Sequence, residues 1–245
     1  MNFNWMLSAG VILAFSIIHF VEISSFLARL TGVKLGANAL AYAVQNAVYM
    51  LTRFFSMLLL PILGLIIDFQ VEKKYYLNIV TLAIASAATM SVLALVFRVR
   101  IVNGFTFVIA DVQKGRSLLG SLIMLPVRVL SPVPKKIQNL PIEINLRSKT
   151  FWLSAIVFSV YATSLFLAFF LGLIFPTYRA AISQLSAVFN AFATVLLTFF
   201  VEPKISVSID SGGYAVEEIL FLLSGRIFGV GVIALSGILI LRSFF

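Results

Sequence analysis

Ionisable residues are scarce inside the long apolar stretches of this 245-residue chain, and three of them could do chemistry there: Glu22, Arg53 and Arg179. A charged side chain at the centre of a bilayer costs about 2.5–3.5 kcal/mol on insertion scales, so such residues usually face a bundle interior or a wet cavity. Arg53 lies near the middle of its stretch. We therefore expect it either to pair with an acid, Glu22 being the nearest in depth, or to line a hydrated cavity. Arg179 lies in the first turn of its stretch, where a structural role is as reasonable as a functional one.

His19 and Glu22 are three residues apart, so they share one face of a helix. Because histidine titrates near neutral pH, the two could form a proton relay or a pH-sensitive gate. A hydrogen bond between helices, or a Glu22–Arg53 ion pair that fixes their register, accounts for the same spacing equally well. Two further arginines, Arg29 and Arg226, are expected only to snorkel from helix ends to the membrane surface.

Uncharged polar residues form stripes beside these charged groups. At about 100° per residue, the polar positions of residues 37–67 share one helical face, and those of residues 180–201 do the same. Such residues often serve only as hydrogen bonds between membrane helices, and we favour that role for the Ser and Thr positions taken alone. The site candidates on these faces are Gln45, Asn46, Ser186 and Asn190; Asn38, Tyr42, Tyr49, Thr52, Ser56, Ser183 and Thr194 accompany them.

The amino-acid composition indicates that these helical faces belong to a membrane protein. Hydrophobic residues make up 61% of the chain and charged residues 11%, and there is no cysteine, whereas a soluble domain is about 25% charged. This excludes a soluble globular enzyme, a disordered chain and a disulfide-stapled secreted domain. With one histidine and no Walker A lysine motif, the chain is expected to have no catalytic residues, no metal site and no cofactor.

Six apolar stretches are long enough to cross a bilayer, each crossing needing about 20 residues. The sequence therefore predicts an all-α, polytopic integral membrane protein in which residues 1–245 form a single membrane domain. The expected crossings are residues 5–27, 37–67, 76–97, 151–175, 180–201 and 217–241.

A basic, proline-containing segment, residues 98–149, separates the third and fourth crossings. It holds nine of the 18 Lys and Arg residues and two acids, so the positive-inside rule assigns it to the cytoplasm and both termini to the outside. Its charge sets the orientation and binds anionic lipids, or attracts an anionic substrate; nothing in it favours nucleic acid. The apolar residues 118–127 are expected to lie in the interface or to re-enter the membrane. The basic residues are Arg98, Arg100, Lys114, Arg116, Arg128, Lys135, Lys136, Arg147 and Lys149.

Gly225 and Gly229 have GxxxG spacing, which suits close helix packing within one chain or across a dimer. Six helices can form a groove alone only if one side stays open to lipid. We therefore expect a homodimer.

Two blocks of spaced residues form a pattern rather than a short signature. The first block contains Ile18-His19-Phe20-Val21-Glu22, Arg29-Leu30-Thr31-Gly32-Val33-Lys34-Leu35-Gly36, Asn46, Arg53, Pro61, Gly64 and Asp68; the second contains Pro176, Arg179, Leu185-Ser186, Asn190, Ala193-Thr194 and Glu202-Pro203. Together they resemble the alternate lipid II flippase family, Amj, over roughly residues 15–70 and 160–205. Phe54 and Phe55 stand where a more polar run is expected, and Glu202 stands where an aspartate is expected. Both departures leave the arginines intact and bear on substrate preference.

The resemblance implies a flippase that moves the undecaprenyl-pyrophosphate-linked peptidoglycan precursor, lipid II, across the bacterial cytoplasmic (inner) membrane without a cofactor. Under that hypothesis Arg53 and Arg179 contact the pyrophosphate, because guanidinium forks suit phosphate oxygens. Small-solute or ion transport, and a non-catalytic role in envelope assembly, remain the alternatives. The amide and hydroxyl candidates would meet sugar or peptide groups: Gln45, Asn46, Ser186 and Asn190.

Overall fold

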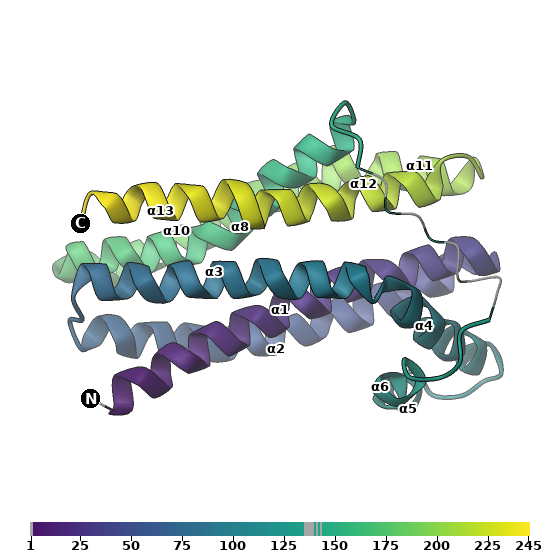
Figure 1. The fold of residues 1–245 in the computed structure, drawn as a ribbon, viewed down its shortest axis with the longest axis horizontal. Helices are drawn as coiled ribbons and strands as arrows, with labels where there is room; N and C mark the ends of the chain where they lie inside the picture. Colours follow the sequence, from purple (N-terminus) through teal and green to yellow (C-terminus); the bar gives the residue numbers. More distant parts are fainter. Residues whose placement is uncertain (1, 135–139, 141, 143) are drawn as a thin grey trace.

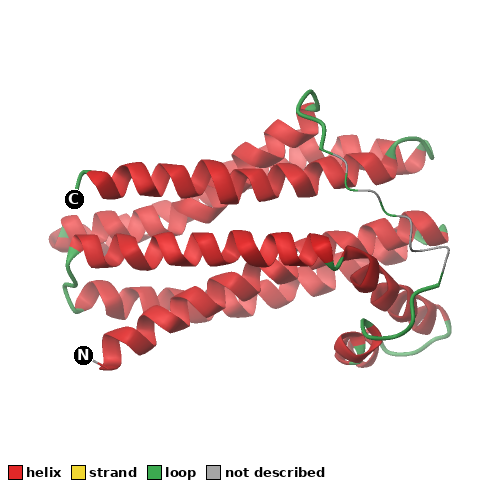
Figure 2. Cartoon of the chain, in the orientation of Figure 1, coloured by secondary structure: helices red, strands yellow, loops and turns green. Residues whose placement is uncertain are grey.

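The structure, a computed structural model, describes residues 2–134, 140, 142 and 144–245, so Lys135 and Lys136 of the basic segment lie outside the described residues. Every element in this part is a helix or a loop (Figure 2). Within the described residues, six helices are long and apolar enough to cross a membrane, which confirms the predicted all-α polytopic membrane fold. Both termini lie at the same end of the bundle (Figure 1), as an even number of crossings requires.

The crossings match the predicted stretches and extend several of them. Four are single helices: α1 (Asn2–Leu35), α2 (Asn38–Asp68), α3 (Lys73–Val96) and α8 (Lys149–Ile174). The fifth is built from η1 (Pro176–Tyr178), α9 (Arg179–Ser183), α10 (Leu185–Leu196), the π-helical η2 (Leu197–Val201) and α11 (Glu202–Asp210). The sixth is built from α12 (Ala215–Phe228), the π-helical η3 (Gly229–Ala234) and α13 (Leu235–Ser243).

The wide turn η2 ends at Val201, two residues before Pro203. Proline has no backbone N–H and its ring crowds the preceding turn, so a regular α-helix cannot continue through it unchanged. A π turn at this point absorbs the change of register and lets one long crossing persist as two helices.

Glycines allow the closest approach between helices. A Cβ on Gly225 would lie 2.2 Å from the carbonyl oxygen of Phe151, and one on Gly229 would lie 2.2 Å from that of Ala155. The GxxxG pair is therefore used within the chain, where α12 and η3 pack on α8, and not as a dimer face. Whether two copies associate stays a prediction.

The bundle has an N-terminal half, α1–α3, and a C-terminal half, α8–α13. Within the first half α1 packs against α2 and α3; within the second α8 packs against α10, α12 and η3. The halves meet where α1 contacts α12 and where α3 contacts η3 and α13. By contrast, α2 and α10 make almost no contact with each other.

The described part of the basic segment is largely helical. α4 (Arg98–Gln113) packs across α1, and α5 (Leu118–Ile123) and α6 (Leu125–Arg128) pack on α4. The sequence predicted a loop over α4 because charged residues flank its buried face. At six and four residues, α5 and α6 are too short to cross a bilayer at 1.5 Å per residue.

Candidate functional site

A cavity of about 480 Å³ lies among α1, α2, α8 and α10. It brings together five of the eight predicted site residues, which come from three helices that are distant in sequence. These residues lie along the middle parts of their crossings, so the cavity lies at membrane depth. The five residues are His19 and Glu22 of α1, Arg53 of α2, and Ser186 and Asn190 of α10.

Arg53 enters this cavity without a charge partner. Its side chain is exposed, and among the described residues it has neither an ion pair nor a side-chain hydrogen bond. Its guanidinium carbon lies 5.7 Å from the ring centroid of Tyr49, a cation–π contact. Of the two placements predicted for Arg53, the pairing with Glu22 is wrong. Arg53 instead lines the cavity.

Glu22 instead pairs with Arg226 of α12, whose Nη2 donates to Oε2 of the carboxylate. The predicted snorkelling of Arg226 is wrong, because its side chain is 0% exposed and its guanidinium carbon lies 4.2 Å from the ring centroid of Phe158. The glycine beside it brings α12 against α8, and this packing directs the arginine into the bundle. Glu22 also lines the cavity, so the acidic member of the pair is the one that faces it.

The α10 wall supplies uncharged hydrogen-bonding groups. Asn190 accepts a hydrogen bond at Oδ1 from Ser164 Oγ at 2.7 Å, and its amide nitrogen has no partner among the described side chains. Tyr161 OH and Thr194 Oγ1 lie 2.6 Å apart, and Ser186 Oγ donates to the carbonyl oxygen of Ser183 at 3.0 Å. Within the described structure, the amide of Asn190 is therefore a hydrogen-bond donor without a partner, and it lines the same cavity as Arg53.

His19 is nearly buried at the base of the same cavity. Its ring lies 4.6 Å from that of Phe15 in an edge arrangement, and its Nδ1 has no hydrogen-bond partner within the described structure. His19 and Glu22 both face the cavity, as the spacing predicted. The proton-relay role stays a prediction.

Three of the predicted site residues do not line the cavity. Gln45 is buried with Oε1 unpartnered, and Asn46 is exposed on α2. Arg179 lies at the end of the bundle and pairs with Asp68. Because Asp68 follows Arg53 by 15 residues on one helix, the two arginines are separated by about 22 Å along the axis.

Arg29 is also paired rather than snorkelling, so that prediction is wrong. Its Nη1 lies 2.5 Å from Oε2 of Glu202, its Nη2 donates to Ser206 Oγ at 2.9 Å, and its guanidinium carbon is 5.1 Å from the ring centroid of Tyr42. The departure from the family pattern at Glu202 thus preserves the carboxylate that Arg29 binds.

Among the described residues, three ion pairs join the two halves, each at a different depth. The pair of Glu22 and Arg226 is central; we term it the central pair. Arg29 and Glu202 form an α1–α11 pair near the α1–α2 turn, and Asp68 and Arg179 form an α2–α9 pair at the opposite end of α2. The cavity therefore lies between an ion pair at each end of the bundle.

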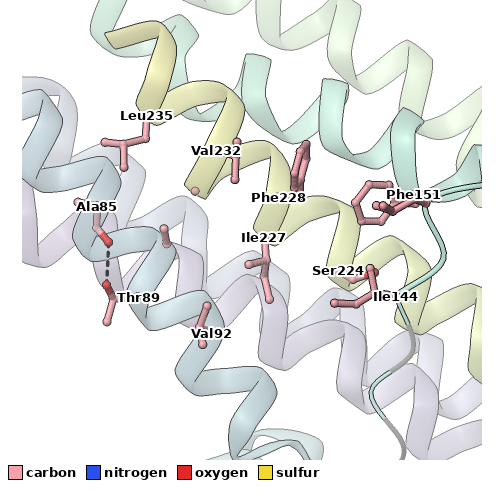
Figure 3. A pocket seen from close by; sticks show the side chains of 13 residues that line it. Ala85, Thr89, Val92, Ile144, Phe151, Ser224, Ile227, Phe228, Val232 and Leu235 are labelled. Atoms are coloured by element: carbon pink, nitrogen blue, oxygen red, sulfur yellow. Dashed lines mark hydrogen bonds between the residues drawn. The ribbon is translucent and has the colours of Figure 1, made fainter. Parts of the chain in front are cut away.

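A second space, of about 600 Å³, is a groove on the other side of the bundle. Its walls come from α3, the start of α8, and α12 through α13, and Figure 3 shows Ile227, Val232 and Leu235 facing Val92 and Ala85 across it. Among the described residues, none that lines this groove is charged. Its Thr89 hydroxyl is already donated to the carbonyl oxygen of Ala85, 2.9 Å away. The groove is thus the larger of the two spaces, but its described lining offers no charged group to a substrate.

Tyr161, Asp68 and Arg226 were not predicted as members or partners of the site. For Arg226 a signal existed: it lies ten residues inside the sixth crossing, at the depth where Glu22 needed a counter-charge. Tyr161 offered none, because one hydroxyl on an apolar helix has no pattern. Among the described residues no three His, Cys, Asp or Glu side chains gather closely enough to hold a metal ion.

Known proteins similar to this chain point to one family. The sequence model of the Amj family, described as "Alternate to MurJ", matches residues 14–218. A protein of Bacillus subtilis (strain 168) named "Lipid II flippase Amj" is 24% identical over 219 residues, which cover 84% of this chain and 81% of the relative. No solved structure matches the chain.

Proposed function

This chain belongs to the Amj family, and we propose that it is a lipid II flippase that carries the precursor's head group through the polar cavity. The proposal rests above all on Arg53, an arginine at membrane depth that faces a cavity without a partner. An unpaired cation in that position costs free energy unless an anion or water meets it. The pyrophosphate of lipid II is such an anion, and a Bacillus subtilis relative is named for that substrate. The protein would act in the bacterial cytoplasmic membrane.

The lipid tail need not enter the protein. The cavity lies between α2 and α10, which barely touch. These two crossings are also the least buried: 28% and 17% of their apolar windows are buried, against 44% or more for the other four. A head group could pass between them while the undecaprenyl chain stays in the surrounding lipid.

The remaining candidates suggest a route along α2. Asn46 precedes Arg53 by about 10 Å along the helix axis, and Arg179 lies about 22 Å beyond it. A phosphate moving from the α1–α2 turn toward Asp68 would meet these groups in order. Gln45, Ser186 and Asn190 would then receive sugar or peptide groups beside that route.

A cavity of about 480 Å³ cannot hold a disaccharide with a pentapeptide, so the two halves must separate during transport. The end pairs are suited to alternate opening, because each joins the N-terminal half to the C-terminal half at one end only. The central pair would act as the pivot, with His19 beside it as the gating or proton-relay group. Exposed ion pairs contribute only about 0–1 kcal/mol, so the more exposed α2–α9 pair can open at low cost.

The membrane potential could drive export without any cofactor. Moving two negative charges outward across an inside-negative membrane is favourable by about 4.6 kcal/mol per 100 mV, at about 2.3 kcal/mol per charge. This direction matches the proposed transport from the inner leaflet to the outer leaflet.

Complementation tests the proposal. The chain is expressed in cells depleted of their essential lipid II flippase, and exposure of lipid II at the outer face is followed. The wild type is expected to rescue growth and exposure, Arg53→Ala is expected to fail at equal membrane expression, and Arg100→Ala, an exposed arginine outside the cavity, is the matched control. Failure of a well-expressed wild type would sink the flippase assignment, and full rescue by Arg53→Ala would sink the site assignment.

A further inference from the structure

The short helices α5 and α6 expose an apolar face that packs against nothing in the described structure. Five large apolar side chains within 12 residues are 52–73% exposed. Their spacing of three to four residues gathers most of them on one side of the segment. They are Leu119, Ile123, Met124, Val127 and Leu130.

The opposite side of this segment packs against the rest of the protein. Leu118, Leu122 and Leu125 pack against the core. A Cβ on Gly104 of α4 would lie 2.9 Å from Leu125 Cδ1 and 2.8 Å from Val129 Cγ2, so α6 rests directly on α4. Because the inner face already packs on the core and on α4, the outer apolar face must be covered by something outside the described structure.

Basic side chains border that outer face. Asp111 of α4 holds both Arg116, at 3.1 Å, and Arg128, at 2.6 Å. Two arginines on one carboxylate leave a net positive charge, and Lys114 adds another nearby. The side chain of Arg116 is 66% exposed, so its guanidinium remains accessible while Asp111 holds one nitrogen.

The segment lies beside the bundle rather than beyond it. Figure 1 shows α5 and α6 alongside the end of the bundle where α1 turns into α2. That is the level of a membrane surface for helices that cross the bilayer, and it is the end that carries the basic segment. An apolar face bordered by cations at that level is complementary to a bilayer with anionic headgroups.

We propose that α5 and α6 form an interfacial anchor that lies in the surface of an anionic bilayer, with the five apolar side chains against acyl chains and Lys114, Arg116 and Arg128 on lipid phosphates. The anchor fixes α4, which packs across α1 near the residue that forms the α1–α11 pair. This surface is separate from the polar cavity and does not depend on which substrate the protein carries.

The absence of cysteine makes a direct test simple. Single substitutions Leu119→Cys, Ile123→Cys and Val127→Cys are labelled with an environment-sensitive fluorophore in the full chain, with one copy per lipid nanodisc. Leu82→Cys on exposed α3 gives the membrane reference, and Ser211→Cys in the exposed α11–α12 turn gives the water reference. The three anchor positions are expected to show blue-shifted emission close to that of Leu82→Cys in phosphatidylglycerol discs.

Lipid composition and the number of copies per disc distinguish an interfacial anchor from a contact between chains. In the Lys114→Gln, Arg116→Gln double variant, the emission at position 123 is expected to shift toward the water reference, most in discs of mixed lipid with little phosphatidylglycerol. Emission equal to the water reference at all three positions would overturn the proposal. So would a blue shift seen only when two copies share a disc, since the face would then be a contact between chains.

Discussion

The polar cavity among α1, α2, α8 and α10 and the apolar groove between α3 and α12–α13 lie in the same bundle and have similar volumes, about 480 and 600 Å³. Arg53, Glu22, His19 and Asn190 border the cavity, whereas no described residue that lines the groove is charged. A membrane supplies acyl chains to any apolar groove, but its hydrocarbon interior supplies no partner to an unpaired arginine. Polar groups at membrane depth, and not the size of a space, are therefore the basis for proposing the cavity as the functional site.

The central pair should give the largest stability effect, because it holds the cavity's acidic wall in place. Arg226→Met leaves Glu22 as a partly buried charge without its partner, and we expect a loss of about 3–5 kcal/mol in the free energy of unfolding. Chemical denaturation in detergent measures it. The double variant Glu22→Gln, Arg226→Met removes both charges and should recover most of the loss; if the double variant is as unstable as the single one, the pair is not what stabilises this site.

A polar-to-apolar change in the cavity should reduce transport. Asn190→Leu keeps the number and branching of the side-chain heavy atoms and removes hydrogen-bonding groups from the cavity that Arg53 lines, worth about 1 kcal/mol or somewhat more. We expect lipid II transport in reconstituted vesicles to fall about tenfold while the protein remains folded. Wild-type transport in this variant would exclude the α10 wall from the substrate route.

An end pair should matter for transport more than for stability. Asp68→Asn weakens the α2–α9 pair, in which the aspartate side chain is 60% exposed, so the free energy of unfolding should change by less than about 1 kcal/mol. The transport rate should nevertheless change, because the end of the bundle that carries this pair opens more readily. An unaltered rate with unaltered stability would remove this pair from the mechanism.

The same kind of change in the apolar groove should do almost nothing. Thr89→Leu replaces a hydroxyl that bonds only to its own helix, so we expect unchanged transport and a stability change within about 0.5 kcal/mol. Comparing Thr89→Leu with Asn190→Leu tests whether the cavity and the groove differ in their importance for transport. A transport loss equal to that of Asn190→Leu would erase the distinction between cavity and groove.

The fold could be predicted because its signals are local. The length of each apolar run predicts a crossing, and the 3.6-residue period places Arg53, Ser186 and Asn190 on the helix faces that line the cavity. Helix α4 was missed because Arg98 and Lys114 border a buried apolar face, and a positive segment between crossings is typical of a loop. The fifth crossing was predicted as one helix because a π turn leaves no mark in composition.

The partners of the arginines could not be predicted, because pairing depends on which helices become neighbours. Glu22 had two candidates at its depth, and only the glycine-mediated packing of α12 on α8 selects Arg226 over Arg53. That selection is what leaves Arg53 free. Arg53 is therefore unpaired among the described residues because Glu22 pairs with Arg226 instead.

The most direct test measures lipid II translocation by purified protein in vesicles, comparing wild type with Arg53→Ala and Arg53→Lys. Charge-assisted hydrogen bonds are worth about 1.5–3 kcal/mol, so we expect translocation by Arg53→Ala to fall about tenfold to a hundredfold. An intermediate rate is expected for Arg53→Lys, which keeps the charge but loses the fork. If Arg53→Ala moves lipid II at the wild-type rate, the polar cavity is not the route of the pyrophosphate.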